Sequence, residues 1–188
     1  MCSSDLYARQ SVVNQIRYLY QRARLNDEAK ALLLAELDRS ASPYYFMSSL
    51  AAIAEKEEKV EEALNWRRKA YDSAEGAATR LQWGATYIRA LVRLTPEDHQ
   101  TISTATMGLL DEVDAADTFS GRNFRVLRSL NKDLEKWDKE HISEAGVATQ
   151  LAGVRDKLTT LCDQQAADST ARENCMTLMP GTAVASGE

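Results

Sequence analysis

Two of the three cysteines in this chain, Cys162 and Cys175, have a spacing that could support disulfide chemistry. They lie thirteen positions apart, at the end of one expected helix and within the next, with a turn expected near Asp168. Antiparallel helices can bring such a pair within disulfide distance, and closing a loop of this length would contribute about 3 kcal/mol to stability. We expect a structural disulfide, which would argue for an oxidising compartment. Two inert thiols and a redox-active pair are the alternatives.

The redox alternative is a thiol oxidoreductase that acts directly through Cys162 and Cys175. Against it, the chain contains no Cys-x-x-Cys, the arrangement that lowers a thiol pKa at a helix N-terminus. The histidines point to no other reaction, because His99 and His141 are the only two and neither belongs to a His-Glu-x-x-His motif. The chain also lacks Gly-x-Ser-x-Gly and any glycine-rich phosphate loop. We therefore predict no catalytic residue, no cofactor and no metal site.

Composition narrows the class of protein further. The 188 residues include 23 Lys and Arg against 28 Asp and Glu, which gives a net charge of −5, and 44% of the residues are hydrophobic. This modest acidity favours neither nucleic acid nor an anionic membrane as a partner. The longest apolar run covers only residues 31–35, whereas a membrane-spanning helix needs about 20 residues. These values predict one globular domain without a transmembrane segment.

The elements that would position these residues are helices. Apolar residues recur at intervals of three and four, as in Leu81, Ile88 and Leu91, and the only prolines are Pro43, Pro96 and Pro180. The expected helices cover 5–24, 27–40, 44–57, 59–74, 77–94, 96–116, 121–141, 144–166 and 171–178. Because the connections are short, we predict an all-α fold of antiparallel helical hairpins, with one domain over 1–178 and a disordered tail at 179–188.

The expected helix 121–141 carries a row of cations, which we call the basic strip. The strip consists of Arg122, Arg125, Arg128, Lys132, Lys136 and Lys139. At about 100° per residue these side chains share one face, and apolar residues, including Leu127, Leu130 and Trp137, collect on the other. The strip is either a solvated surface or a docking site for an acidic partner, and we favour the solvated surface.

Residues 44–76 and 77–116 resemble two copies of one helical hairpin, with Ala51 and Gly84 at matching places 33 positions apart. This pattern resembles the tetratricopeptide repeat, in which small residues let the two helices of a hairpin approach closely. Ala63 and Ala70 would occupy the small positions of the second helix. The copies depart from the repeat at Ala54 and Arg67, where aromatic residues are usual, and at Pro96, which restarts a helix.

A wider resemblance runs through residues 32–40, 63–71 and 82–84 and through the paired cysteines. These segments are similar to the helical C-terminal region of bacterial periplasmic thioredoxin-family proteins. In that family a thioredoxin domain with a Trp-Cys-x-x-Cys motif precedes the helices, and this chain contains neither that motif nor a βαβ pattern. The resemblance implies a periplasmic accessory domain that holds a protein or peptide partner, with the redox chemistry outside these residues.

If the hairpins form such an array, their concave side is the expected binding surface. The residues expected to contact a protein partner are Tyr44, Met47, Trp66 and Arg67 on the first hairpin, and Arg80, Trp83 and Tyr87 on the second. Cys2 is either incidental or the lipid-anchored first residue of a processed lipoprotein, although no lipobox precedes it here. A cytoplasmic scaffold with free thiols is a further alternative.

Overall fold

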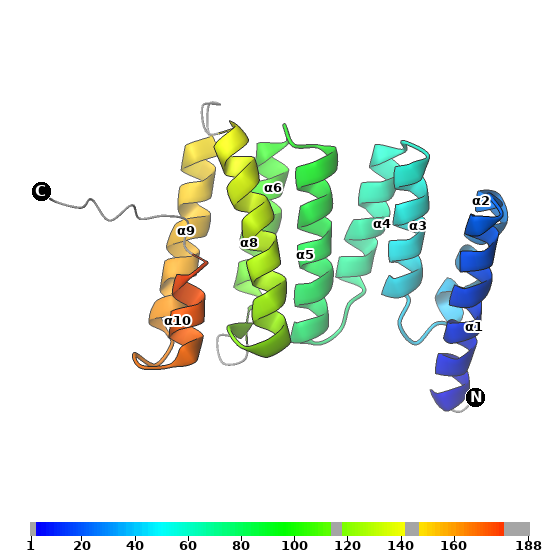
Figure 1. Cartoon of the computed structure of the whole chain (residues 1–188), viewed down its shortest axis with the longest axis horizontal. Coiled ribbons are helices and arrows are strands. Elements are labelled where there is room, and N and C mark those ends of the chain that lie inside the picture. Colours follow the sequence, from blue (N-terminus) through cyan, green and yellow to red (C-terminus); the bar gives the residue numbers. More distant parts are fainter. Residues whose placement is uncertain (1–2, 114–117, 142–146, 179–188) are drawn as a thin grey trace, which may run out of the picture. The chain divides into compact units, whose positions relative to one another are not determined.

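The computed structural model describes residues 3–113, 118–141 and 147–178 (Figure 1). By its internal contacts the chain divides into two compact units, Met1–Glu75 and Gly76–Glu188, and the predicted domain 1–178 spans both. The described residues form helices joined by turns and contain no strand, which confirms the prediction of an all-α fold. None of the described helices is long and apolar enough to cross a membrane. Cys2 and the predicted tail 179–188 lie outside the described residues.

The first unit contains α1 (Ser3–Arg22), α2 (Asn26–Glu36), a short 3₁₀ turn η1 (Leu37–Arg39), α3 (Tyr44–Lys56) and α4 (Val60–Asp72). These are the blue to cyan helices of Figure 1. Within the unit α1 packs on α2, α2 on α3, and α3 on α4. The core cluster consists of Val13, Ala29, Leu33, Phe46, Leu50 and Ile53. Trp66 and Tyr20 pack against this cluster from its edge.

The α3–α4 hairpin has small residues where its helices come close, as the repeat pattern predicts. Ala51 and Ala63 are completely buried, and Ala70 keeps only 1% of its surface exposed. The turn reverses at Glu58, whose φ of 59° is left-handed, and the Lys59 N–H donates to the Ala54 carbonyl at 2.9 Å. These small side chains permit the two helices of the hairpin to pack closely.

The second unit contains α5 (Ala77–Leu94), α6 (His99–Asp111), α8 (Gly121–His141), α9 (Val147–Asp163) and α10 (Thr170–Met176), coloured green to red in Figure 1. Helix α5 packs on α6 and α8, and α9 packs on α6, α8 and α10. The largest completely or almost completely buried side chains of this unit are Trp137, Phe119, Ile88, Ile102, Leu109, Leu178 and Cys162.

Helix α6 begins at His99, later than the predicted start of the helix 96–116, and ends at Asp111. Residues 114–116 of the predicted helix lie outside the described residues. The N-cap of α6 is Asp98, whose carboxylate accepts a hydrogen bond from the Thr101 N–H at 3.1 Å. An aspartate that satisfies a free N–H of the first turn is a stronger start signal than Thr95 followed by Pro96. Pro96 lies in the turn before the helix, where its carbonyl accepts a hydrogen bond from the Trp137 indole at 2.8 Å.

Helix α8 spans the predicted residues 121–141 and is amphipathic as expected. All six cations of the basic strip are exposed, while Leu127, Leu130 and Trp137 keep 4%, 3% and 1% of their surface. Some of these cations have partners, since Arg122 donates to Gln82 and Lys136 lies 3.9 Å from Glu140. An exposed row of cations fits both the solvated surface and the docking site, so the choice between them stays a prediction.

Candidate functional site

Four of the predicted binding residues lie on the α3–α4 hairpin of the first unit. Tyr44 and Tyr45 begin α3 with their ring centroids 5.0 Å apart, and the Tyr44 hydroxyl donates to Ser42 at 3.0 Å. The Met47 sulfur accepts a hydrogen bond from Ser73 at 3.5 Å. Trp66 is half-buried against the core, with the Lys69 ammonium 4.6 Å from its ring centre. The binding role of Tyr44, Met47 and Trp66 stays a prediction.

Arg67 connects the two helices of this hairpin. Its guanidinium donates to the Glu55 carboxylate at 2.9 and 3.1 Å and to the Ser48 hydroxyl at 2.7 Å. Only 12% of the Arg67 side chain and 19% of the Glu55 side chain are exposed. Charge-assisted hydrogen bonds in such a sheltered place stabilise more than surface pairs do. Arg67, which departs from the repeat pattern, therefore braces α4 against α3 and offers little surface to a partner.

The other three predicted binding residues lie in the second unit. Trp83 and Tyr87 keep only 6% of their surface exposed, so they contribute to the core of α5. Arg80 is partly exposed, but it makes a bidentate pair with Glu112, with both hydrogen bonds at 2.7 Å. In this unit the predicted residues therefore serve packing and the α5–α6 connection more than they form a recognition surface.

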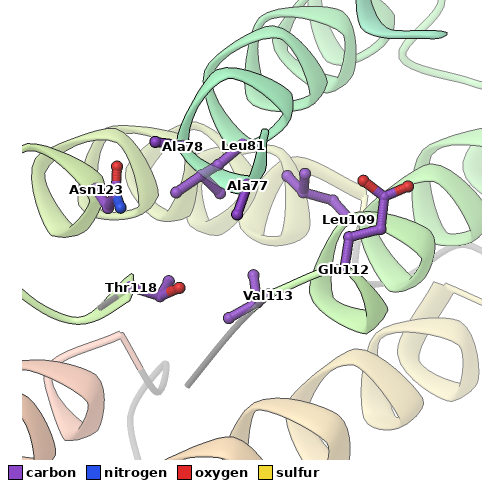
Figure 2. Close-up of a pocket in the computed structure, with 8 residues that line it drawn as sticks. All are labelled: Ala77, Ala78, Leu81, Leu109, Glu112, Val113, Thr118 and Asn123. Carbon is purple, nitrogen blue, oxygen red and sulfur yellow. The ribbon is translucent and has the colours of Figure 1, made fainter. Parts of the chain in front are cut away.

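A cavity of about 120 Å³ lies beside the Arg80–Glu112 pair, between the start of α5 and the end of α6. Figure 2 shows the lining side chains, which are Ala77, Ala78, Leu81, Leu109, Glu112, Val113, Thr118 and Asn123. The α5 residues are small or aliphatic, and the polar atoms come from Glu112, Thr118 and Asn123. Among the described residues, this lining contains no histidine, cysteine or lysine, and its polar side chains form no metal-ligating set.

The most exposed apolar surface among the described residues lies on α1, and the sequence analysis did not select it. Val12, Ile16 and Leu19 are exposed at 54%, 36% and 63%, and we call them the α1 apolar stripe. Their spacing of four and three puts them on one face of the helix, whereas Val13 faces the core at 5% exposure. The sequence signal for the stripe is that α1 has apolar residues on two faces. A helix that packs on one globular core needs only one apolar face.

The paired cysteines lie near the C-terminal ends of α9 and of the short helix α10. The structure joins Cys162 to Cys175 with their Cα atoms 5.4 Å apart, and both residues are completely buried. Arg172 holds the same corner by donating to the Cys162 carbonyl at 3.0 Å and to Asp163 at 2.9 Å. In thiol–disulfide exchange the attacking sulfur must approach a disulfide along its S–S axis. The burial of both cysteines blocks that approach, so it disfavours the alternative of a thiol oxidoreductase.

Two histidines for which the sequence offers no metal motif come together in the second unit. His99 begins α6, His141 ends α8, and their ring centroids are 5.7 Å apart. Together with Glu97 they offer three ligand atoms that all lie within 4.8 Å of one another. Local motifs could not reveal this group, because only the packing of α6 and α8 with α5 and α9 brings positions 42 residues apart together.

No family model, curated protein or solved structure matches this chain.

Proposed function

We propose that this chain is a non-catalytic helical module that binds a partner protein, and that the partner places an apolar helix on the α1 apolar stripe. The exposure of Val12, Ile16 and Leu19 on one face of α1 is the observation that carries this proposal. Single apolar residues on a surface need no explanation, but a continuous row on one helix is typical of an interaction site.

The spacing of the stripe suits another helix. Ala8 and Ala23 extend it at both ends, so the row runs Ala8, Val12, Ile16, Leu19, Ala23, with spacings of four, four, three and four. Rows of this kind pack into the grooves of a facing helix, and small residues at the ends permit close approach. We therefore expect the partner to present apolar residues at intervals of three and four.

The charged residues around the stripe indicate which charges a partner helix should carry beside its apolar row. Helix α1 carries Asp5 against Arg9, Arg17 and Arg22, and Arg24 follows in the turn. Arg9 is paired with Glu36, whereas Arg22 and Arg24 are exposed near the Leu19 end of the stripe. Acidic residues beside the C-terminal end of the stripe would complement this charge and favour one orientation of the partner.

The resemblance to periplasmic thioredoxin-family proteins extends the proposal. On this hypothesis the module is the accessory part of a thiol–disulfide protein, and it holds a substrate or partner for chemistry performed elsewhere. The buried cysteine pair supports this setting, because disulfides persist in oxidising compartments such as the periplasm.

Selection of displayed helical peptides against the wild-type chain tests the proposed interface. We expect the selected peptides to share apolar residues at intervals of three and four with acidic flanks. The double substitution Ile16→Lys and Leu19→Lys should weaken their binding by about tenfold or more, because each aliphatic anchor contributes on the order of 1 kcal/mol. The matched control places the same two charges on other exposed helix positions, Ala31→Lys and Asn65→Lys.

Circular dichroism would establish that both double variants fold. Peptides without an apolar repeat, or peptides that bind the stripe variant and the control variant equally, would contradict the proposal. Analytical ultracentrifugation adds a separate outcome. A wild-type dimer that the stripe substitutions convert to a monomer would identify a second copy of this chain as the occupant, and would overturn the proposal of a different partner.

A further inference from the structure

We infer that Glu97, His99 and His141 form a binding site for a transition-metal cation, with Zn²⁺ as the best-fitting occupant. The three ligand atoms lie within 4.8 Å of one another, and all three residues belong to the second unit. The chain contains only two histidines, and the fold brings both to this point. Figure 1 shows the α5–α6 turn and the last turn of α8 at the same end of the unit. The inference is independent of the α1 interface.

His141 is held in the orientation that a metal ligand needs. Its Nδ1 lies 2.8 Å from the Trp137 carbonyl oxygen, four residues earlier in α8. A carbonyl oxygen can only accept, so Nδ1 carries the proton of this hydrogen bond and the neutral ring has its lone pair on Nε2. That Nε2 lies 3.9 Å from the Glu97 carboxylate. Metal-binding histidines are commonly fixed in this way, with the second ring nitrogen donating to a carbonyl or carboxylate.

Trp137 fixes the other parts of the site relative to His141. Its indole Nε1 donates at 2.8 Å to the carbonyl of Pro96, the residue just before Glu97. Its ring stacks on His141 at 5.6 Å and lies at an angle to His99 at 5.5 Å. Because Trp137 is only 1% exposed, packing restrains its ring. The turn that carries Glu97 and the helix end that carries His141 are thus joined before any ion binds.

The ligand types and distances favour zinc. Two imidazole nitrogens and one carboxylate oxygen are typical zinc ligands, whereas Ca²⁺ and Mg²⁺ prefer oxygen alone. In a tetrahedral zinc site neighbouring ligand atoms are about 3.3 Å apart, so the separations within the group must shorten by no more than about 1.5 Å. The Glu97 side chain is 75% exposed and can move toward the two imidazoles. Three protein ligands leave a fourth position for water or another ligand.

The surroundings of the group tolerate an added cation. His141 lines a cavity of about 290 Å³ together with the charged residues Arg89, Arg93, Asp133, Lys136 and Glu140. Of the three cations in this set, Arg89 lies 2.5 Å from Asp133 and Lys136 lies 3.9 Å from Glu140. Acidic side chains therefore offset the positive charge of these two. The competing occupant is a proton, which would turn the His141–Glu97 contact into a simple ion pair.

Titration of the untagged protein with Zn²⁺ and Co²⁺ tests the site. Calorimetry should show one Zn²⁺ per chain, and Co²⁺ should give the intense visible absorption of tetrahedral coordination. Glu97→Gln and His141→Gln should each weaken binding by about tenfold or more and remove the cobalt absorption, because losing a ligand costs at least as much as losing a second-shell partner. Glu173→Gln is the matched control, since it removes an exposed carboxylate of the second unit that belongs neither to the ligand group nor to the lining of this cavity.

Several outcomes would overturn the inference. The first is no saturable binding of either ion, which leaves a proton-linked ion pair as the role of the group. The second is unchanged affinity in Glu97→Gln, and the third is equal loss in Glu173→Gln, which would indicate scattered binding to surface carboxylates. If His141→Gln fails to fold, Glu97→Gln still decides the question, because that side chain is mostly exposed and its amide keeps the same shape.

Discussion

Two glutamates lie in different environments: Glu57 in the turn 57–59 between α3 and α4, and Glu97 in the turn 95–98 between α5 and α6. The Glu57 carboxylate accepts hydrogen bonds from Lys30 and from Lys59, the second at 2.9 Å. These hydrogen bonds hold the pKa of the Glu57 carboxyl below its usual value. Glu97 is 75% exposed and lies 3.9 Å from the His141 ring nitrogen. The Glu57 carboxylate is therefore neutralised by two ammonium groups, whereas the Glu97 carboxylate faces an imidazole with which it could bind the same metal ion.

The two units also differ in the links that hold their helices together. Ion pairs connect helices in both units, with Arg67 from α4 on Glu55 of α3 in the first and Arg80 from α5 on Glu112, just after α6, in the second. The second unit adds a covalent link that joins α9 to α10 and an aromatic cluster that joins α8 to the α5–α6 turn. The same hairpin architecture therefore depends on ion pairs in one unit and on ion pairs together with a crosslink in the other. A reductant should act on the second unit alone.

Reduction of the Cys162–Cys175 bond should have the largest effect. Opening a loop whose ends are thirteen positions apart should cost the second unit about 3 kcal/mol, because the unfolded chain regains the freedom that the crosslink removes. Hydrogen exchange read by mass spectrometry should show faster exchange in α9 and α10. Exchange in α3 and α4 should stay unchanged. Equal acceleration in both hairpins would contradict a crosslink that acts on one unit.

Material from the native compartment provides the control for this prediction. The denatured protein should gain two alkyl groups only after reduction, at Cys162 and Cys175. Alkylation of both residues without reduction would show free thiols in the cell, and it would remove the support that the cysteine pair gives to a periplasmic setting.

Arg67→Met should come second, with a loss of about 2 kcal/mol from the first unit. The substitution keeps an apolar stem but leaves the Glu55 carboxylate, which is only 19% exposed, without the guanidinium that binds it. Urea unfolding followed by far-ultraviolet circular dichroism measures the change. Arg68→Met is the matched control, because Arg68 is 59% exposed and surface substitutions usually stay within about 0.5 kcal/mol. Equal losses in the two variants would refute the bracing role of Arg67.

The start of α6 gives a smaller effect that sharpens the contrast between the turns. Asp98 caps α6, whereas Lys59 makes no side-chain cap at the start of α4. Asp98→Ala should cost about 1 kcal/mol, and Asp98→Asn should keep most of the stability, because an amide oxygen can also accept from the Thr101 N–H. Thermal unfolding measures both. A loss in Asp98→Asn as large as in Asp98→Ala would mean that charge, not the cap, stabilises the turn.

Much of the fold could be predicted from periodicity alone. Helix 77–94 has its predicted bounds, and so does helix 121–141, because their apolar rows are long and a glycine, Gly76 or Gly121, marks the start of each. The start of α6 was predicted three residues too early, since Pro96 resembles a first helical residue but lies in the turn before Asp98. Local patterns specify helices well, and they specify ends less well where two start signals compete.

The candidate sites were harder to predict, for physical reasons. Trp83 and Tyr87 match a repeat pattern, but the same apolar character that makes an aromatic residue a good anchor also buries it in the core. The α1 apolar stripe needs knowledge of which face of α1 packs on α2. The histidine group needs the packing of α6, α8 and the turn between α5 and α6. Such relations depend on tertiary contacts between distant positions, which spacing along the chain does not contain.

Acid should produce the smallest effect, and in the first unit it should act on two carboxyls whose pKa values are lowered. The pKa of Glu57 is lowered by hydrogen bonds from Lys30 and Lys59, and the pKa of Glu36 by its hydrogen bonds from Arg9. A carboxyl whose pKa is lower in the folded state contributes stability above its unfolded pKa, and this contribution is lost as the pH falls through the folded value. Between roughly pH 5 and pH 3 each pair should lose less than about 1 kcal/mol.

Urea titrations at several pH values, with α3 and α4 read by pulsed hydrogen exchange, measure this dependence. Glu57→Gln should lower the free energy of unfolding at neutral pH, because the amide carries no negative charge for the lysines to bind. It should also flatten the decline of that free energy in acid, because no carboxylate is left at this position to be protonated. Glu61→Gln, at an exposed position of α4, is the matched control and should keep the wild-type slope. If Glu57→Gln declines as steeply as the wild-type protein, its ion pairs do not stabilise the turn. The contrast with Glu97 would then rest on exposure and geometry, not on how each carboxylate is neutralised.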